Sequence, residues 1–256
     1  TAICGGAFAN CTAMTSVIIP NSVDTIGEYA FSGCDSLETV EIPNSLRNIG
    51  IGAFEFTPWL EAEKAKNHLV IANNILIDGT DCTGDISVPN GVSAIAEGAF
   101  YDCYSINSVI LPAGIQKIPK WAFANCSNLS SVILPETLSY IDDVAFYGCQ
   151  GLKEIQIPDT VTYIGTETFY SCGFVTVDLP HKISHIGEGA FYACTELSAI
   201  TLPEKIEAIE KNMFSWCESL AEITIPENVK SIGDMSFSLC ESLSDITLPE
   251  SVSVIG

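Results

Sequence analysis

The sequence is poor in positive charge. Only 10 Lys and Arg residues stand against 32 Asp and Glu residues in a chain of 256, which gives a formal net charge of −22. Nucleic acids and anionic lipid surfaces are bound through clusters of Lys and Arg, and a field of this sign repels both. We therefore expect neither a nucleic-acid partner nor an anionic membrane partner.

Long apolar runs are also missing. No stretch approaches the roughly 18 consecutive apolar residues of a membrane helix, so we expect no membrane insertion. A secretory leader is not visible either, because Thr1 does not begin a charged segment followed by an apolar one. Apolar residues nonetheless make up 47% of the chain and charged residues 16%. This balance indicates a folded, soluble domain rather than a disordered one, and we expect it to be a monomer.

What the chain does contain is one repeated pattern. A phenylalanine column recurs every 22 or 23 residues, with one gap of 46 residues between Phe54 and Phe100, and a proline column follows it in phase. The consensus is A-F-x-x-C-x-x-L-x-x-[IV]-x-[IL]-P-x-x-[VLI]-x-x-I-G-x-x, as in "AFYGCQGLKEIQIPDTVTYIG" at residues 145–165. One such repeat has too few apolar side chains to bury them alone, so it must stack on copies of itself. The pattern predicts a solenoid.

Each repeat predicts one strand and one corner. The alternation of Ile155 and Ile157 with polar neighbours is typical of a strand with one buried face, which Pro158 ends. A second apolar pair predicts a short extended or turn segment on the opposite side of the coil. Gly165 is expected to supply the backbone conformation of a sharp corner. The stretch around Phe146 has the length of about one helical turn and needs neighbours to cover it.

The motif LxxIxLPxxLxxIGxxAFxxC resembles the bacterial BspA-type leucine-rich repeat, also called the treponemal class, over nearly the whole chain. The resemblance implies an α/β fold, a right-handed leucine-rich-repeat solenoid with one parallel β-sheet face and short helical turns opposite. It also implies proteins that are mostly secreted or on the cell surface, many of them credited with adhesion to host proteins or other cells. It implies no catalytic residues and no cofactor.

We interpret residues 1–256 as a single solenoid domain. The first residues, "AICGGAF", are in phase with the repeat, and the last, "SVIG", stop just before the next expected Ala-Phe. Solenoids normally carry polar end caps, so we expect this chain to be part of a longer array.

One region, at about residues 55–88, departs from the repeat. Its segment "WLEAEKAKN" has good helix formers and predicts a short surface helix. The following "HLVIANNILID" places Asn73 and Asn74 between two apolar runs, and Asn accepts the positive backbone angles of a tight hairpin turn. We expect an inserted β-hairpin. The insert is either a structural variant of the coil or a dedicated ligand site, since recognition often resides in insertions on a rigid scaffold.

Most of the 11 cysteines follow the repeat. The cysteine column consists of Cys11, Cys34, Cys103, Cys126, Cys149, Cys172, Cys194, Cys217 and Cys240. A spacing of 22 or 23 lacks the C-x-x-C pairs of zinc sites, so no metal is expected. Stacked cysteines lie within disulfide range, but reduced packing thiols are the favoured interpretation because their Cβ atoms point the same way. Cys4 and Cys82 lie outside this column.

Two surfaces are candidates for binding. Outward strand positions include the apolar pair Ile110 and Ile133, followed by Gln156 and Asp178, and an exposed apolar patch on a curved sheet is a possible docking site. Trp121 belongs to a second group, the aromatic residues near the phenylalanine column, which either contact a partner or shield the corner from water. Together with Asn73 and Asn74, these residues are the candidate binding residues.

No set of residues points to catalysis. The chain has three histidines, with no recurring acid and no nearby reactive cysteine to form a nucleophile and base. The acids of residues 78–81 and the pair at 142–143 could hold a hard cation, but they lack the alternation of a calcium loop and are expected in solvated turns. We predict a non-enzymatic binding scaffold for a protein or glycan ligand, extracellular or on the cell surface. The alternative is a structural spacer that holds another domain away from the cell envelope.

Overall fold

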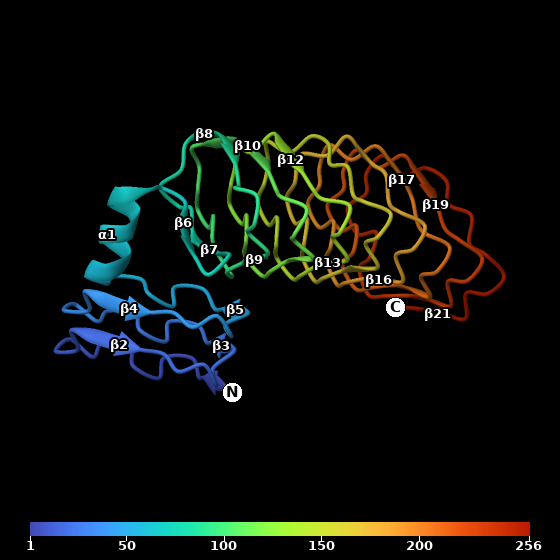
Figure 1. The fold of residues 1–256 in the computed structure, drawn as a ribbon. Coiled ribbons are helices and arrows are strands. Elements are labelled where there is room, and N and C mark those ends of the chain that lie inside the picture. Colours follow the sequence, from blue (N-terminus) through green and yellow to red (C-terminus); the bar gives the residue numbers. More distant parts are fainter.

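The computed structural model describes residues 1–256 as a parallel-strand solenoid of about eleven turns (Figure 1). Two ladders of strands run along it on opposite sides, one formed by the strand that precedes the proline and one by a shorter strand after it. In regular turns the strand partners are 22 or 23 residues apart, as in the pairing of Val109 with Val132. The repeat in the sequence is therefore the repeat of the coil.

The ladder of longer strands is divided into three parts. It consists of β2 (Ser16–Ile18) and β4 (Thr39–Glu41), then β8 (Gly84–Ser87), β10 (Ile106–Ile110) and β12 (Ser131–Ile133), then β15 (Thr176–Val177), β17 (Ala199–Thr201) and β19 (Glu222–Thr224). The first interruption is at the insert. The second lies between β12 and residues 154–157, where only an isolated bridge between Gln156 and Asp178 continues the ladder.

The expectation of one sheet face was incomplete, because the short segment on the opposite side also forms parallel ladders. These are β1 (Ala2–Ile3), β3 (Thr25–Ile26) and β5 (Asn48–Ile49); β6 (Val70–Ala72), β7 (Ile75–Asp78) and β9 (Ala94–Ile95); β11 (Lys117–Ile118), β13 (Tyr140–Ile141), β14 (Tyr163–Ile164) and β16 (His185–Ile186); β18 (Ala208–Ile209), β20 (Ser231–Ile232) and β21 (Val254–Ile255). Except for the antiparallel pair β6 and β7, they pair in parallel.

The corners contain hydrogen-bonded turns instead of the expected helical turns, and α1 (Pro58–Lys66) is the single helix. The reason is backbone geometry on both sides of the phenylalanine. Around Phe146, Val144 and Gly148 have φ values of 52° and 72°. The residues two before and two after the phenylalanine adopt this left-handed conformation in turn after turn. A right-handed helix cannot pass through two such residues.

Gly165 has a different role from the one expected. Its φ is not positive, but a Cβ there would lie 2.4 Å from the backbone nitrogen of Asp143 in the preceding turn. Gly27 and Gly50, at the same position of their turns, would clash with the preceding turn in the same way. Glycine is needed here because stacked backbones approach closely, not because the chain turns sharply.

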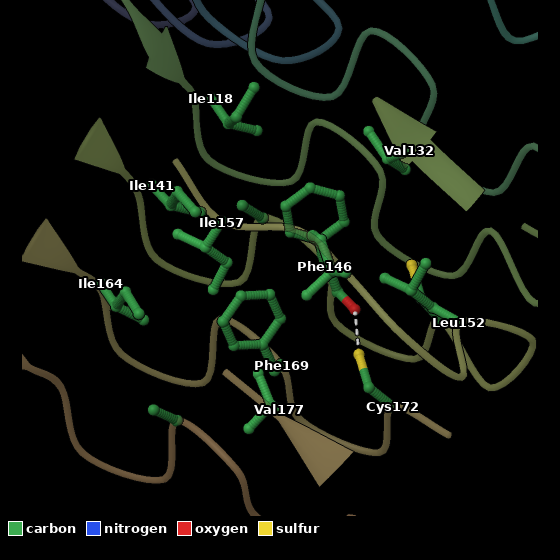
Figure 2. Close-up of a cluster of buried hydrophobic side chains, with 14 of the residues drawn as sticks. Ile118, Val132, Ile141, Phe146, Leu152, Ile157, Ile164, Phe169, Cys172 and Val177 are labelled. Atoms are coloured by element: carbon green, nitrogen blue, oxygen red, sulfur yellow. Dashed lines mark hydrogen bonds between the residues drawn. The ribbon is translucent and has the colours of Figure 1, made fainter. Parts of the chain in front are cut away.

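The core is a stack of phenylalanine rings inside the coil, enclosed by the apolar residues of both ladders (Figure 2). Phe146 and Phe169 lie with ring centroids 5.7 Å apart, between Ile141 and Ile164 on one side and Leu152 on the other. Neighbouring rings along the column stack at 5.1 to 5.7 Å. Each ring fills the space between the two ladders.

The insert divides this core in two. One cluster contains 17 buried residues and the other 50. The stack ends at Phe54, against which Trp59 packs edge-on at 4.8 Å, and begins again at Phe100. Between them the chain still completes one turn, but an irregular one.

Gly79 occupies the phenylalanine position of this irregular turn. Its N–H donates to the carbonyl of Ala99, just as Phe100 N–H donates to Ala122 of the next turn. Cys82 N–H donates to the Gly79 carbonyl, which is the bond that column cysteines make to their own phenylalanine. Cys82 therefore stands in the cysteine column, contrary to the expectation that it lies outside.

Helix α1 replaces the longer strand of the irregular turn, in the region predicted to be helical. Thr57 stands at a cysteine position and caps the helix, accepting a hydrogen bond from the N–H of Leu60 at 3.2 Å. Antiparallel β6 and β7 follow, and Asn73 and Asn74 between them have φ values of 46° and 64°. Strand β7 then pairs in parallel with β9, so part of the insert belongs to the coil itself.

Candidate functional site

The largest hollow in the molecule is a pocket of about 630 Å³ at the irregular turn. Four parts of the chain build it: the corners before Phe31 and around Phe54, helix α1, the end of β7, and the corners at residues 97–102 with Trp121. Its volume lies within the range of about 300 to 1,000 Å³ that is usual for ligand sites. The pocket lies where the two parts of the core meet.

A shortened turn opens this pocket. In a regular turn the last apolar residue and the phenylalanine are five positions apart, as Ile95 and Phe100 are, whereas Leu76 and Gly79 are three apart. Glu97 N–H consequently skips the irregular turn and donates to the carbonyl of Ile49, two turns back, at 2.9 Å. The segment that a regular turn would place in this space is missing, and the space stays open.

Aromatic rings form much of the pocket wall. Tyr29, Phe56 and Trp121 all have the left-handed backbone conformation found at the corners, with φ values of 54°, 57° and 59°. Tyr29 and Phe56 are 45% and 69% exposed. Trp121 is half-buried and packs edge-on against Tyr101, with centroids 6.0 Å apart. Exposed rings on a rigid frame are suitable for stacking on a ligand.

The charged groups of the wall are nearly all acidic. They are Glu28, Glu55, Glu61, Asp78, Glu97 and Asp102, with Lys64 as the one cation. Lys64 is 13% exposed and is held by its neighbours: its Nζ lies 2.9 Å from Thr80 Oγ1, 3.3 Å from Asp78 and 3.6 Å from Asp81. The acids of residues 78–81 thus surround a lysine and do not lie in a purely solvated turn.

Glu97 is the least compensated of these acids. Burial raises its pKa, and the nearby Glu28 raises it further. Lys117 and Lys120 act in the opposite direction, but they pair with Asp142 and Asp143 at 2.6 and 3.0 Å. Glu97 itself forms no ion pair. The pocket therefore contains a half-buried carboxyl group without a cation of its own.

The Asp142–Asp143 pair differs from the expected solvated turn. Asp142 is buried at 6% exposure and is paired with Lys117, while Asp143 accepts a hydrogen bond from the N–H of Thr166. No group of three or more His, Cys, Asp or Glu side chains is arranged to hold a metal ion.

The candidate strand residues lie on another part of the surface. Ile110 and Ile133 are direct partners on β10 and β12 and are 44% and 55% exposed. Gln156 bridges to Asp178. A shallower hollow of about 470 Å³ separates Ile133 from Gln156, where the ladder is interrupted. The four residues follow one line along the sheet, but the interruption divides them into two pairs.

Of the other candidates, Trp121 lines the main pocket and the two asparagines do not. Asn73 and Asn74 are exposed at the turn between β6 and β7. The Asn73 side-chain amide donates to the carbonyl of Ile42, so it ties this turn to the preceding coil. Its contact explains an internal role for Asn73.

Two stacks of surface rings were not among the sequence candidates. Tyr140, Tyr163 and His185 stack at 4.2 and 4.6 Å on the short ladder, with Lys117 Nζ 5.2 Å from the Tyr140 centroid. Their spacing of 22 and 23 residues was the available signal. A second stack runs along the corners and consists of Tyr147, Tyr170 and Tyr192, at 4.4 and 4.8 Å.

The cysteine column lies inside the corners, and its thiols are free. Each thiol donates to the carbonyl of the phenylalanine one turn back, as Cys172 does to Phe146 at 3.2 Å (Figure 2). Burial raises the pKa of the thiols of Cys82 and Cys240 to about 11 and of Cys194 to about 12. These groups are protonated near neutral pH, which suits a hydrogen-bond donor and not a nucleophile.

A family model confirms the repeat. The model of the BspA-type leucine-rich repeat region matches residues 1–76, 78–174 and 162–256, in six copies. No protein with a curated description matches the chain. Helix α1, with nine residues, is too short to cross a membrane, and no other helix is available to do so.

Solved structures with the same fold come from several bacteria. The leucine-rich repeat protein TpLRR of T. pallidum is 34% identical, with a TM-score of 0.63 over 67% of this chain and 83% of that one. A leucine-rich repeat protein from Bacteroides ovatus is 26% identical, with a TM-score of 0.59 over 99% of this chain and 75% of that one. A leucine rich cell surface protein from Faecalibacterium prausnitzii is 24% identical, with a TM-score of 0.50 over 86% of this chain and 62% of that one.

Proposed function

Because the chain belongs to the BspA-type leucine-rich repeat family, we propose that it is a non-catalytic scaffold that binds a protein partner through the pocket at its irregular turn. Members of this family are mostly secreted or displayed on cells, and this supports a location outside the cell. We extend the proposal to an adhesin-like role, in which the partner lies on a host or a neighbouring cell.

The pocket is the observation that carries this proposal. Regular turns repeat the same core and the same corner, and the pocket is the one place where aromatic rings from different turns surround an open volume of about 630 Å³. A rigid frame on both sides keeps the pocket formed without a ligand, which lowers the entropy cost of binding. Recognition on repeat scaffolds commonly depends on such local departures from the consensus.

The test is capture by the immobilised chain. We expect matrix proteins, mucins or whole cells to be retained by the wild type and lost with Trp121→Ala, which removes a pocket ring without touching either core. Ile110→Asp with Ile133→Asp serves as the comparison, because it changes the other exposed apolar surface. Retention by Trp121→Ala and loss by the strand variant would move the binding site to the sheet. Loss by neither would refute a role for both surfaces.

The spacer role is the second candidate function. The unbroken stack of rings from Phe100 to Phe237 supports it, because this part of the coil is uniform and stiff. The neighbouring sequence of the parent protein distinguishes the two. A catalytic or anchoring domain joined to the array favours the spacer, whereas a pocket variant that loses capture favours the scaffold.

A further inference from the structure

We propose that the pocket at the irregular turn accepts a cationic side chain, arginine or lysine, presented by the protein partner. This inference rests on the proposed function and specifies its ligand. The observations that carry it are an open volume, aromatic walls and a wall charge that is almost entirely negative.

The aromatic walls are arranged for a flat or elongated cationic group. Tyr29 and Phe56 stand on one side of the pocket, on the corners before the irregular turn, and Tyr101 and Trp121 stand on the other, on the corners after it. A guanidinium or ammonium group is attracted to the face of such rings, most strongly to tryptophan. The aliphatic stem of the same side chain can pack against the rings, which a small inorganic cation cannot do.

The charge of the wall excludes an anion and favours a cation. Lys64 cannot attract an anionic ligand, because Asp78 and Asp81 already lie within 3.6 Å of its Nζ. Glu97, in contrast, is half-buried and lacks an ion-pair partner, and Glu28 lies close enough to act on it. A cation at this point compensates both carboxylates at once. Charge-assisted hydrogen bonds of this kind are about twice as strong as neutral ones.

The same features disfavour a neutral sugar as the primary ligand. A sugar ring can stack on the aromatic residues and can donate hydroxyl hydrogen bonds to the acids. It leaves the charge of Glu97 uncompensated, however, and a buried charge without a partner is costly. The neutral ligand therefore becomes an outcome of the test.

Tryptophan positions permit a direct measurement of pocket occupancy. The chain has three tryptophans: Trp121 lines the pocket, Trp59 is buried against Phe54, and Trp216 is 44% exposed on a distant turn. We suggest labelling all three with 5-fluorotryptophan and assigning the three ¹⁹F resonances by Trp→Phe variants. Trp216 then reports diffuse attraction of cations to the acidic surface.

The probes are the capped peptides Gly-Gly-Arg-Gly-Gly and Gly-Gly-Lys-Gly-Gly, with a citrulline peptide as the uncharged match of the arginine one. We expect a cationic peptide to shift Trp121 but not Trp216, and citrulline to bind at least about tenfold more weakly, as lost cation–π and charge-assisted bonds predict. Glu28→Gln with Glu97→Gln should weaken binding by a similar factor. Glu204→Gln with Glu227→Gln removes the same charge elsewhere and should leave binding unchanged.

Other outcomes would refute the inference in distinguishable ways. Equal binding of the citrulline peptide, or binding only of a neutral oligosaccharide at Trp121, overturns the cationic ligand and leaves the pocket as the binding site. Equal shifts of Trp121 and Trp216, or equal losses in both pairs of Glu→Gln variants, show diffuse attraction and overturn it as well. If no probe shifts Trp121, the inference is wrong. The capture experiment with Trp121→Ala then decides separately whether the proposed function stands.

Discussion

Phe100 lies against Gly79, the residue that stands at the phenylalanine position of the preceding turn. A Cβ on Gly79 would be 2.4 Å from Cε1 and 2.8 Å from Cδ1 of the Phe100 ring. The ring is fully buried and cannot move aside freely. This contact ends the stack of rings in the larger core, and it is also what leaves room for the pocket next to it.

We expect Gly79→Ala to destabilise the protein by about 1 to 3 kcal/mol, as overpacking in a dense core does. Chemical denaturation followed by circular dichroism measures the effect. The double variant Gly79→Ala with Phe100→Leu should cost less than the sum of the two single changes, because the smaller side chain relieves the clash. Unfolding midpoints that are equal for Gly79→Ala and the wild type would contradict this account.

The buried position of the cysteine column predicts selective labelling. Cys4 is exposed and Cys11 is partly exposed, whereas the column from Cys34 to Cys217 is buried. Iodoacetamide at pH 8 should modify Cys4 first and Cys11 more slowly, and it should leave Cys82 and Cys194 unmodified, because burial raises the pKa of these thiols to about 11 and about 12. Peptide mass spectrometry measures the sites. Oxidised pairs, or rapid native-state labelling of most of the column, would require a different role for these residues.

The sequence predicted the regular part of this fold because its letters repeat. Burial of Ile155 and Ile157 and the position of α1 follow from apolar spacing and helix propensity, which are local properties. The pocket could not be predicted in that way. It depends on Gly79 taking the place of a phenylalanine at distances of 25 and 21 residues from its neighbours, which breaks the register that reveals the other turns.

The left-handed corner residues also escaped prediction, for a related reason. Their positions hold almost any residue, including Val144, Glu167 and Met235, with φ values of 52°, 50° and 55°. Here the stacked neighbours impose the conformation, and the local sequence does not. Trp121 was correctly taken as a surface aromatic, but only the structure brings it to the pocket that Glu97 and Phe56 also line.

The divided core predicts that damage to one part stays local. Phe31 belongs to the cluster of 17 buried residues and Phe146 to the cluster of 50, and both are fully buried. Each change to alanine should cost about 3 to 5 kcal/mol. In hydrogen exchange, Phe31→Ala should speed exchange mainly before α1, because solenoid turns couple to their nearest neighbours and the stack is interrupted at Gly79. Loss of protection extending past Phe123 would show that the two clusters unfold together.

Glu97 predicts a gain of stability when its charge is removed. Burial and the nearby Glu28 raise its pKa in the folded protein, so the folded state disfavours the ionised carboxyl group relative to the unfolded state. This destabilisation is fully present above the folded-state pKa. It fades as the pH falls through that pKa and is absent below the unfolded value of about 4.3. Glu97→Gln should therefore be more stable than the wild type at pH 7, and the two should converge near pH 4.

The groups that act on Glu97 determine how this comparison is made. Asp142 raises the pKa of Glu97, and Lys117 and Lys120 lower it. All of them remain in both proteins, so the difference in unfolding free energy between Glu97→Gln and the wild type isolates the one carboxyl group. Glu204→Gln, an exposed change on a regular turn, is the matched control and should show no such pH dependence. A wild type more stable than Glu97→Gln at pH 7 would mean that a cation already compensates this carboxylate in the free protein, and the pocket would then have no reason to recruit one from a partner.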